Sequence, residues 1–270
     1  MQTIIIGVKV AITLIFLLYA SWSDYKTREV TNKVWMFYAP IALALSLAEI
    51  LLYDSSKLTY FGLSVGLTFL IAFLLFYSGG FGGADSKAFM CIALALPFST
   101  EMLFNPILPQ GISPLSQVLF PIVIFSNSVL IAAASVVYIL LRNIIQRLNK
   151  TKEFFEGSLK TESIGKKIVV LITGYRLPIL RLKEKWHIYP MEDIEITDEN
   201  NIKRKLVIDP REEGRKEILD RLNKAIEKKQ ISDYVWSTPG LPMLIFVTIG
   251  VIISILFGDV IWMLISSLLS

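Results

Sequence analysis

The sequence predicts an all-α membrane bundle of six transmembrane helices, with a small cytoplasmic α+β domain inserted before the last helix. Of its 270 residues, 54% are hydrophobic, and the mean hydropathy is +0.58. An ordinary soluble domain of this length is much less apolar. A helix needs about 20 apolar residues to cross a bilayer. Runs near or above that length lie at residues 4–22, 34–53, 59–78, 86–104, 116–141 and 240–265.

Basic residues set the expected orientation of these spans. If the first span runs from outside to inside, the loops on the cytoplasmic side contain Lys26, Arg28, Lys33 and Lys87, and the outer loops keep Lys57. The positive-inside rule favours this arrangement. The N-terminus is therefore expected outside the cell. The fourth run is interrupted by Pro97 but is kept as a span, because the charges on either side of it require a crossing.

The hydrophilic stretch from residue 142 to 237 is the expected cytoplasmic domain, so residues 1–141 form the first five helices and 238–270 the sixth. We expect an amphipathic helix on the bilayer surface within residues 160–173 and a charged helix within 212–229, after Asp209-Pro210. Short alternating runs predict strands, joined by turns such as Asp198-Glu199-Asn200-Asn201. These strands are expected at residues 176–183, 186–189, 194–196 and 203–208.

Two aspartates carry the strongest functional signal. Asp24 follows the first apolar run, and Asp85 ends the segment Gly79-Gly80-Phe81-Gly82-Gly83-Ala84-Asp85 between the third and fourth runs. Counting crossings brings both to the cytoplasmic face. A carboxylate at the edge of hydrocarbon is costly and therefore suggests a functional role. Two carboxylates that meet hold one proton near neutral pH, so one can activate a water while the other polarises a carbonyl.

Each aspartate also has a purely structural interpretation. Asp24 can be a polar stop at the membrane edge, although the C-terminal end of a helix disfavours negative charge. Asp85 can be an N-cap of the fourth helix. The glycines before Asp85 favour the functional interpretation, because they permit close backbone approach and positive φ, as an extended peptide beside the acid requires.

Other chemistry has weaker support in the sequence. Ser86 and Lys87 are adjacent, so on a helix their side chains point to different sides, which disfavours a serine–lysine protease. The lone histidine, His187, makes a catalytic triad or a histidine-based metal site improbable. The single cysteine, Cys91, excludes an internal disulfide and a multi-cysteine zinc site. No metal or other cofactor is needed. The basic excess of the soluble domain suggests anionic lipid headgroups as partners, rather than nucleic acid.

The chain resembles the archaeal prepilin peptidases, which are membrane aspartic proteases of the GxGD type, and among them the preflagellin (archaellin) peptidases most closely. The resemblance lies in Asp24-Tyr25-Lys26-Thr27-Arg28 and on to Asn32, in Gly82-Gly83-Ala84-Asp85, and in Trp236-Ser237-Thr238-Pro239-Gly240-Leu241-Pro242 with Gly258-Asp259. Their order and spacing over nearly the whole chain are more specific than any one of them.

This resemblance implies that Asp24 and Asp85 are the catalytic residues, facing the cytoplasm. From the glycines themselves, we expect Gly82, Gly83 and Ala84 to form a loop beside the substrate. Ala84 departs from a strict GxGD motif. The implied substrate is a pilin-like or archaellin precursor, whose short basic leader is cut off before its hydrophobic helix. With Cys91 alone, the chain lacks the cysteine-rich zinc segment of bacterial relatives, and nothing supports methyltransferase activity.

Two other functions remain as alternatives. A small transporter or channel would use membrane acids as a proton or ion pathway, with acids near mid-helix and internal repeats. Asp24 and Asp85 instead lie at the ends of spans, and the sequence has no evident repeat. A membrane-anchored interaction protein would need neither aspartate.

Overall fold

The computed structural model describes residues 1–150, 154–185, 187–198, 201–208, 214–239 and 242–269. These residues form two compact units. Unit 1 consists of residues 1–132 and 242–270, and unit 2 of residues 133–241. The boundary between the units falls within the long helix α6 (Phe120–Lys150).

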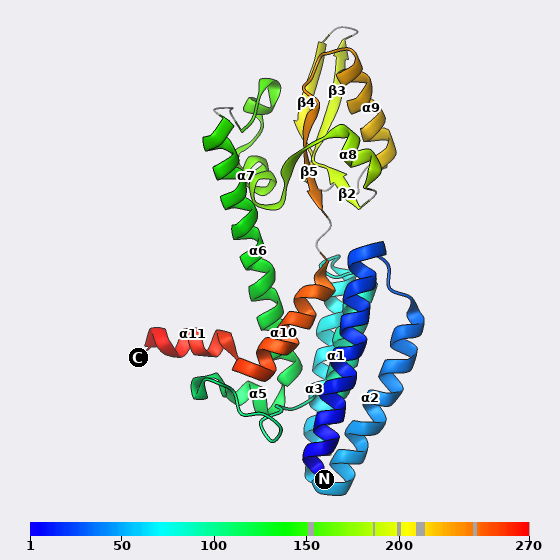
Figure 1. The fold of residues 1–270 in the computed structure, drawn as a ribbon, viewed down its shortest axis with the longest axis vertical. Coiled ribbons are helices and arrows are strands. Elements are labelled where there is room, and N and C mark those ends of the chain that lie inside the picture. The colour runs from blue at the N-terminus through cyan, green and yellow to red at the C-terminus, as the bar shows by residue number, and fades with distance from the viewer. Residues whose placement is uncertain (151–153, 186, 199–200, 209–213, 240–241, 270) are drawn as a thin grey trace. The chain divides into compact units, whose positions relative to one another are not determined.

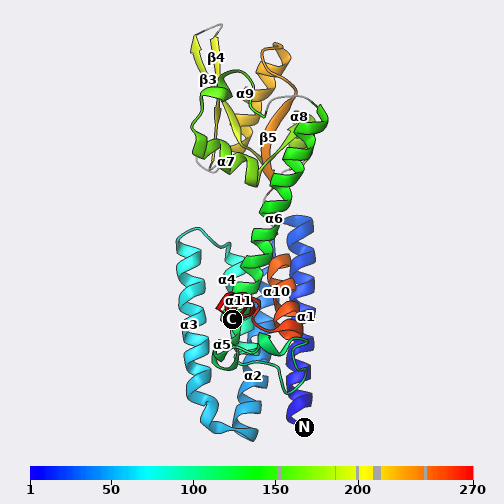
Figure 2. The ribbon, with the colours of Figure 1, turned by 90° about the vertical axis from the view of Figure 1, so that its left-hand side faces the viewer.

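Unit 1 is helical, and its centre is the short helix α4 (Gly83–Ala95), which packs against α1, α2, α3 and α10. Figures 1 and 2 show the long helices of this unit lying roughly side by side. The other elements of the unit are α1 (Gln2–Thr27), α2 (Asn32–Tyr53), η1 (Ser55–Lys57), α3 (Leu58–Tyr77), η2 (Pro109–Gly111), α5 (Pro114–Val118), the first part of α6, α10 (Met243–Phe257) and α11 (Val260–Leu269).

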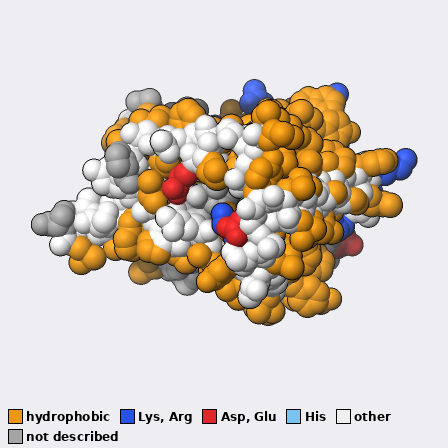
Figure 3. Space-filling model, turned by 90° about the horizontal axis from the view of Figure 1, so that it is seen from below, with side chains coloured by type: hydrophobic (Ala, Val, Ile, Leu, Met, Phe, Trp, Pro, Cys, Tyr) orange, Lys and Arg blue, Asp and Glu red, His pale blue; other side chains and the backbone are white. Residues whose placement is uncertain are grey.

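The outer surfaces of these helices are apolar. Large hydrophobic side chains are exposed along them, for example Leu18, Phe37 and Leu70. Orange hydrophobic side chains likewise cover much of the face in Figure 3, with charged groups in only a few places. In the described residues, α1, α2, η1 with α3, and α6 are each long and apolar enough to cross a membrane. The chain is therefore a multi-pass membrane protein.

The six predicted spans are not confirmed. The described residues contain four helices that meet the criteria for a span, or five if α10 and α11, bent by 55°, count as one. The expected fourth span at 86–104 corresponds to α4, which has 13 residues and is therefore only about 20 Å long. Helix α4 ends before Pro97, and its side chains face protein on almost all sides. Its apolar character thus reflects burial in the bundle.

The predicted sixth span is also interrupted, whereas the predicted fifth span corresponds to α6 and only begins a few residues later than expected. The run at 116–141 divides into α5 and α6 around Leu119. The run at 240–265 breaks at Gly258, where φ is +78°. A Cβ at Gly258 would lie 2.3 Å from the backbone oxygen of Gly111, and that oxygen accepts a hydrogen bond of 2.8 Å from the N–H of Asp259. The close approach of these two backbones forces the bend.

Charged side chains inside the bundle have partners. Nζ of Lys9 in α1 lies 2.6 Å from Oε2 of Glu49 in α2, and Lys9 is only 5% exposed. Asp259 is also buried and accepts hydrogen bonds from Ser113 and from the N–H of Trp262. Pairing of this kind lowers the cost of burying charge.

Unit 2 contains a three-stranded antiparallel sheet in the order β1-β5-β2 and a two-stranded β3-β4 hairpin. Its elements are the end of α6, η3 (Gly157–Thr161), α7 (Ile164–Thr173), β1 (Tyr175–Pro178), α8 (Ile179–Glu184), β2 (Ile188–Pro190), β3 (Glu192–Asp198), β4 (Asn201–Leu206), α9 (Arg215–Glu227) and β5 (Tyr234–Pro239). The strand predicted at 176–183 is half wrong, because from Ile179 the chain is helical. Strand β5 was not predicted as a strand.

The remaining predictions for unit 2 agree with the structure in part, and the strand predicted at 186–189 begins only at Ile188, in β2. Helix α7 lies within residues 160–173 and α9 within 212–229. Strands β3 and β4 include the predicted runs at 194–196 and most of 203–208. Trp186, residues 199–200 of the predicted turn, the Asp209-Pro210 dipeptide and residues 240–241 lie outside the described residues.

Candidate active site

Asp24 lies in the last turn of α1, which ends at Thr27. A negative charge is unfavourable at this position, because the C-terminal end of a helix repels a carboxylate. Two groups offset this repulsion. The backbone N–H of Leu244, in the first turn of α10, and the Arg28 guanidinium both lie near enough to attract the charged Asp24 carboxylate. Asp24 therefore lies near the N-terminal end of a second helix, α10, whose partial positive charge favours a carboxylate.

Hydrogen bonds fix α1 and α10 to each other just below Asp24. The hydroxyl of Ser21 donates to the carbonyl of Leu244 at 2.9 Å and lies 2.7 Å from the hydroxyl of Thr248. Thr248 also contacts the carbonyl of Leu17. All of these groups are buried, so the first turn of α10 has a defined position beside the last turn of α1.

Asp85 lies in the first turn of α4 as its third residue. Gly82, not Asp85, is the N-cap, so the N-cap interpretation of Asp85 is wrong in detail. The Asp85 carboxylate reaches back and accepts a hydrogen bond of 3.0 Å from the N–H of Gly82. This arrangement uses one carboxylate oxygen to complete the helix N-terminus. The helix dipole further favours a negative charge at this position.

The structure brings Asp24 and Asp85 together at one end of unit 1. Helix α4 packs against both α1 and α10, and the two carboxylates lie close enough for Asp24 to repel the charge of Asp85. Both side chains are partly buried. Two acids 61 positions apart in the chain therefore lie near each other, Asp85 in the first turn of α4 and Asp24 in the last turn of α1, close to the start of α10.

The segment before Asp85 is anchored by aromatic packing. Phe81 is buried and stacks on Phe89 at 5.5 Å between ring centroids, and Phe125 meets the edges of both rings. Gly82 is exposed beside the carboxylate, whereas Gly83 and Ala84 are partly buried. The expectation of positive φ holds only for Gly79. Gly82 is distinctive for another reason, since a Cβ there would lie 3.1 Å from Oδ2 of Asp85.

Models of known protein families match most of the chain. Residues 11–140, which contain both aspartates, match the type IV leader peptidase family, and residues 166–260 match the archaeal peptidase A24 C-terminus type II. The chain belongs to the type IV leader peptidase family. Its relatives include the preflagellin peptidase of Methanococcus voltae, 25% identical over 267 residues that cover 92% of this chain and 94% of the relative. The preflagellin peptidase of Methanococcus maripaludis is 24% identical over 250 residues, covering 90% and 92%.

Sequence reasoning did not find every group at this leader peptidase site. The N–H of Leu244 and the Arg28 guanidinium had no predicted role, although Pro242 just before α10 was a signal for a helix start. Ser86 is buried and donates to the carbonyl of Gly82, while Lys87 is exposed and donates to Asn32. Among the described residues, no three His, Cys, Asp or Glu side chains are grouped so that they could hold a metal ion.

Proposed function

We propose that this leader peptidase is an aspartic endopeptidase in which Asp24 and Asp85 share one proton. The observation that carries the proposal is the nearness of the two carboxylates at one end of unit 1, where α4 packs against both α1 and α10. Helix N-termini at both residues support it, because their N–H groups can hold the single negative charge of the pair.

The chemistry follows from the two protonation states. The ionised carboxylate takes a proton from water as the water oxygen attacks the scissile carbonyl carbon, and the protonated carboxyl gives its proton to the carbonyl oxygen. The intermediate then collapses. The carboxyl that took the water proton delivers it to the amide nitrogen, the other carboxylate recovers a proton from a hydroxyl, and the C–N bond breaks. One water is consumed, and the pair again holds one proton.

The substrate is an archaellin or other pilin-like precursor, from which the enzyme removes the short leader peptide. The preflagellin peptidase relatives, aligned over nearly their whole length, support this assignment. Gly82, Gly83 and Ala84 border the place where the substrate backbone lies. The exposed Gly82 has no side chain to separate a peptide from Asp85.

The site and unit 2 face the cytoplasm, and the N-terminus lies outside. The basic residues near the end of α1, Lys26 and Arg28, support this orientation. Helix α4, too short to cross alone, completes a sixth crossing together with the chain that follows it. In this arrangement α4 is shielded from lipid by its neighbours, as a short helix within a membrane must be.

The proposal is tested by incubating membranes that contain the protein with candidate precursors and sequencing the N-termini of the products. We expect a single new N-terminus immediately before the hydrophobic helix of the precursor. Cleavage should persist with a metal chelator and stop with an inhibitor that mimics the tetrahedral intermediate of aspartic proteases. Loss of cleavage in the chelator would contradict the aspartic mechanism.

A further inference from the structure

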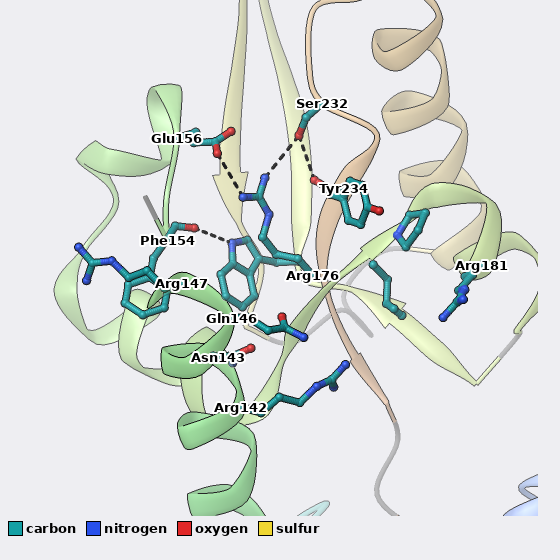
Figure 4. Close-up of a pocket in the computed structure, with 13 residues that line it drawn as sticks. Arg142, Asn143, Gln146, Arg147, Phe154, Glu156, Arg176, Arg181, Ser232 and Tyr234 are labelled. Carbon is teal, nitrogen blue, oxygen red and sulfur yellow. Dashed lines mark hydrogen bonds and ion pairs between the residues drawn. The ribbon is translucent and has the colours of Figure 1, made fainter. Parts of the chain in front are cut away.

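Unit 2 contains a cavity of about 360 Å³ that takes no part in the proposed catalysis. Its lining includes four arginines from three elements: Arg142 and Arg147 from α6, Arg176 from β1 and Arg181 from α8. Figure 4 shows these side chains around the cavity, with the hydroxyl of Ser232 and the amides of Asn143 and Gln146. Glu156 is the carboxylate in this lining among the described residues. The cavity therefore carries a net positive charge.

The arginines are held in place by aromatic rings and by hydrogen bonds. The guanidinium of Arg142 lies 4.5 Å from the ring centre of Tyr175, and that of Arg147 lies 4.6 Å from Phe154. Nη1 of Arg176 contacts Glu156 at 3.2 Å, while its Nε is buried without a hydrogen-bond partner in the described structure. A buried donor of this kind favours an acceptor from a ligand. Planar guanidinium groups suit phosphate oxygens especially well.

The position of the cavity along α6 indicates where such a phosphate comes from. The apolar part of α6 begins at Phe120, and a helix of about 20 residues crosses the hydrocarbon. Arg142 is the first charged residue of α6 and lies 22 positions after Phe120, so a span that starts at Phe120 would bring Arg142 to the level of lipid headgroups. Arg147 is only about 8 Å farther along the helix.

Helix α7 supplies a second sign of lipid contact. Its Ile164 and Ile168 are 75% and 52% exposed, as expected for an amphipathic helix on a bilayer. The side-chain amide of Asn143, which also lines the cavity, donates to the carbonyls of Leu171 and Gly174 at 2.8 and 2.7 Å. The C-terminal end of α7 is thus fixed to α6 at the level of the cavity.

We propose that this arginine-lined cavity binds the phosphate of an anionic lipid headgroup. A volume of about 360 Å³ lies in the range of small-molecule sites. The ligand chemistry is a phosphate with further polar groups, for which Gln146 and Ser232 provide hydrogen bonds. A soluble phosphate compound would offer the same chemistry. The level of the cavity on α6 and the apolar face of α7 favour the lipid.

The test uses the full chain in neutral detergent and two short-chain lipids, dihexanoyl-phosphatidylglycerol and dihexanoyl-phosphatidylcholine, with inorganic phosphate as a third probe. Binding is measured by titration calorimetry. We expect saturable binding of dihexanoyl-phosphatidylglycerol. Binding of dihexanoyl-phosphatidylcholine and of inorganic phosphate should be much weaker. Equal affinity for inorganic phosphate and the anionic lipid would overturn the lipid assignment. Binding of no anionic probe would overturn the site itself.

Matched variants separate a site from general charge attraction. The double variant Arg142→Gln with Arg181→Gln removes two positive charges from the cavity, and Lys224→Gln with Lys228→Gln removes two from exposed positions of unit 2 outside its lining. We expect Kd to rise at least about tenfold in the arginine variant and less than about twofold in the lysine variant. An equal rise in Kd in the arginine variant and the lysine variant would contradict the proposal. The variant Arg142→Lys with Arg181→Lys keeps the charge and should recover only part of the affinity.

Discussion

The carboxylate of Asp85 accepts a hydrogen bond of 3.0 Å from the backbone N–H of Gly82, across the first turn of α4. One bond thus joins the start of a helix to a proposed catalytic acid. The bond restricts the Asp85 carboxylate, which lies close enough to Asp24 to be repelled by its charge.

Replacing Gly82 with alanine should therefore impair cleavage. The new Cβ would lie 3.1 Å from Oδ2 of Asp85, so the carboxylate has to shift. A misplacement of well under 1 Å at a reacting group lowers the rate by about 10- to 100-fold. The measurement is kcat/KM for a precursor, with the circular dichroism spectrum as a check on folding.

Gly83→Ala is the matched control for Gly82→Ala. Its Cβ would meet only a ring carbon of Phe76, at an ordinary distance of 3.6 Å. We expect a smaller loss of rate than for Gly82→Ala, because the methyl group at Gly83 does not displace the Asp85 carboxylate. Equal losses in the two variants would show that the loop tolerates no added methyl group, and would remove the special role of the Gly82–Asp85 bond.

The Lys9–Glu49 ion pair should contribute to the stability of unit 1. Lys9→Met leaves the largely buried Glu49, 14% exposed, without its 2.6 Å cationic partner and with only the Gln2 amide as a donor, which costs about 3 kcal/mol. Adding Glu49→Gln should restore much of the loss, because no buried charge then remains unpaired. Thermal unfolding in detergent measures the effect.

The exposed pair Lys57–Asp54, with side chains 45% and 41% exposed, provides the comparison for this test. Lys57→Met should change the unfolding temperature little, since exposed pairs contribute little to stability. If Lys9→Met behaves like Lys57→Met, the buried pair has no structural role.

Single cysteines introduced into a Cys91→Ser background test the proposed topology. Thr27 and Lys228 should react only from the cytoplasmic side, and Ser55 and Asn105 from outside; all four are exposed. Asn105 is the decisive position, because it follows α4. If it reacts from the same side as Thr27, α4 enters and leaves the membrane on one face, and five rather than six crossings remain.

Local sequence patterns predicted the long helices well, because α1, α2, α3 and α6 each present a continuous apolar run. The same apolar pattern gave a wrong prediction at α4, where we expected a membrane-spanning helix. A short helix surrounded by protein and a helix facing lipid are both apolar, and hydropathy does not distinguish them. The bend at Gly258 depends on the backbone of Gly111, 147 positions away, and such a contact leaves no local signal.

The sequence singled out the two aspartates because each is costly where it lies, and the structure places them near each other at one end of unit 1. The groups that surround the two aspartates could not be predicted from the sequence. The N–H of Leu244 acquires its role only through the packing of α10 on α1. The arginine cavity was missed for the same reason. Arg142 and Arg181 are far apart in sequence, and only the pairing of β1 with β5 and the fold of unit 2 around α6 place them on one cavity.

The most direct test of the account compares Asp24→Asn, Asp85→Asn and Asp54→Asn in membranes, with the rate of precursor cleavage as the measurement. The control residue Asp54 lies exposed beside η1 and undergoes the same chemical change. We expect each catalytic variant to lose activity by about 10³-fold or more, since paired groups act as a unit, while Asp54→Asn cleaves like the unchanged protein. All three should insert into the membrane in equal amounts. Near-normal cleavage by either Asp24→Asn or Asp85→Asn would contradict the two-carboxylate mechanism.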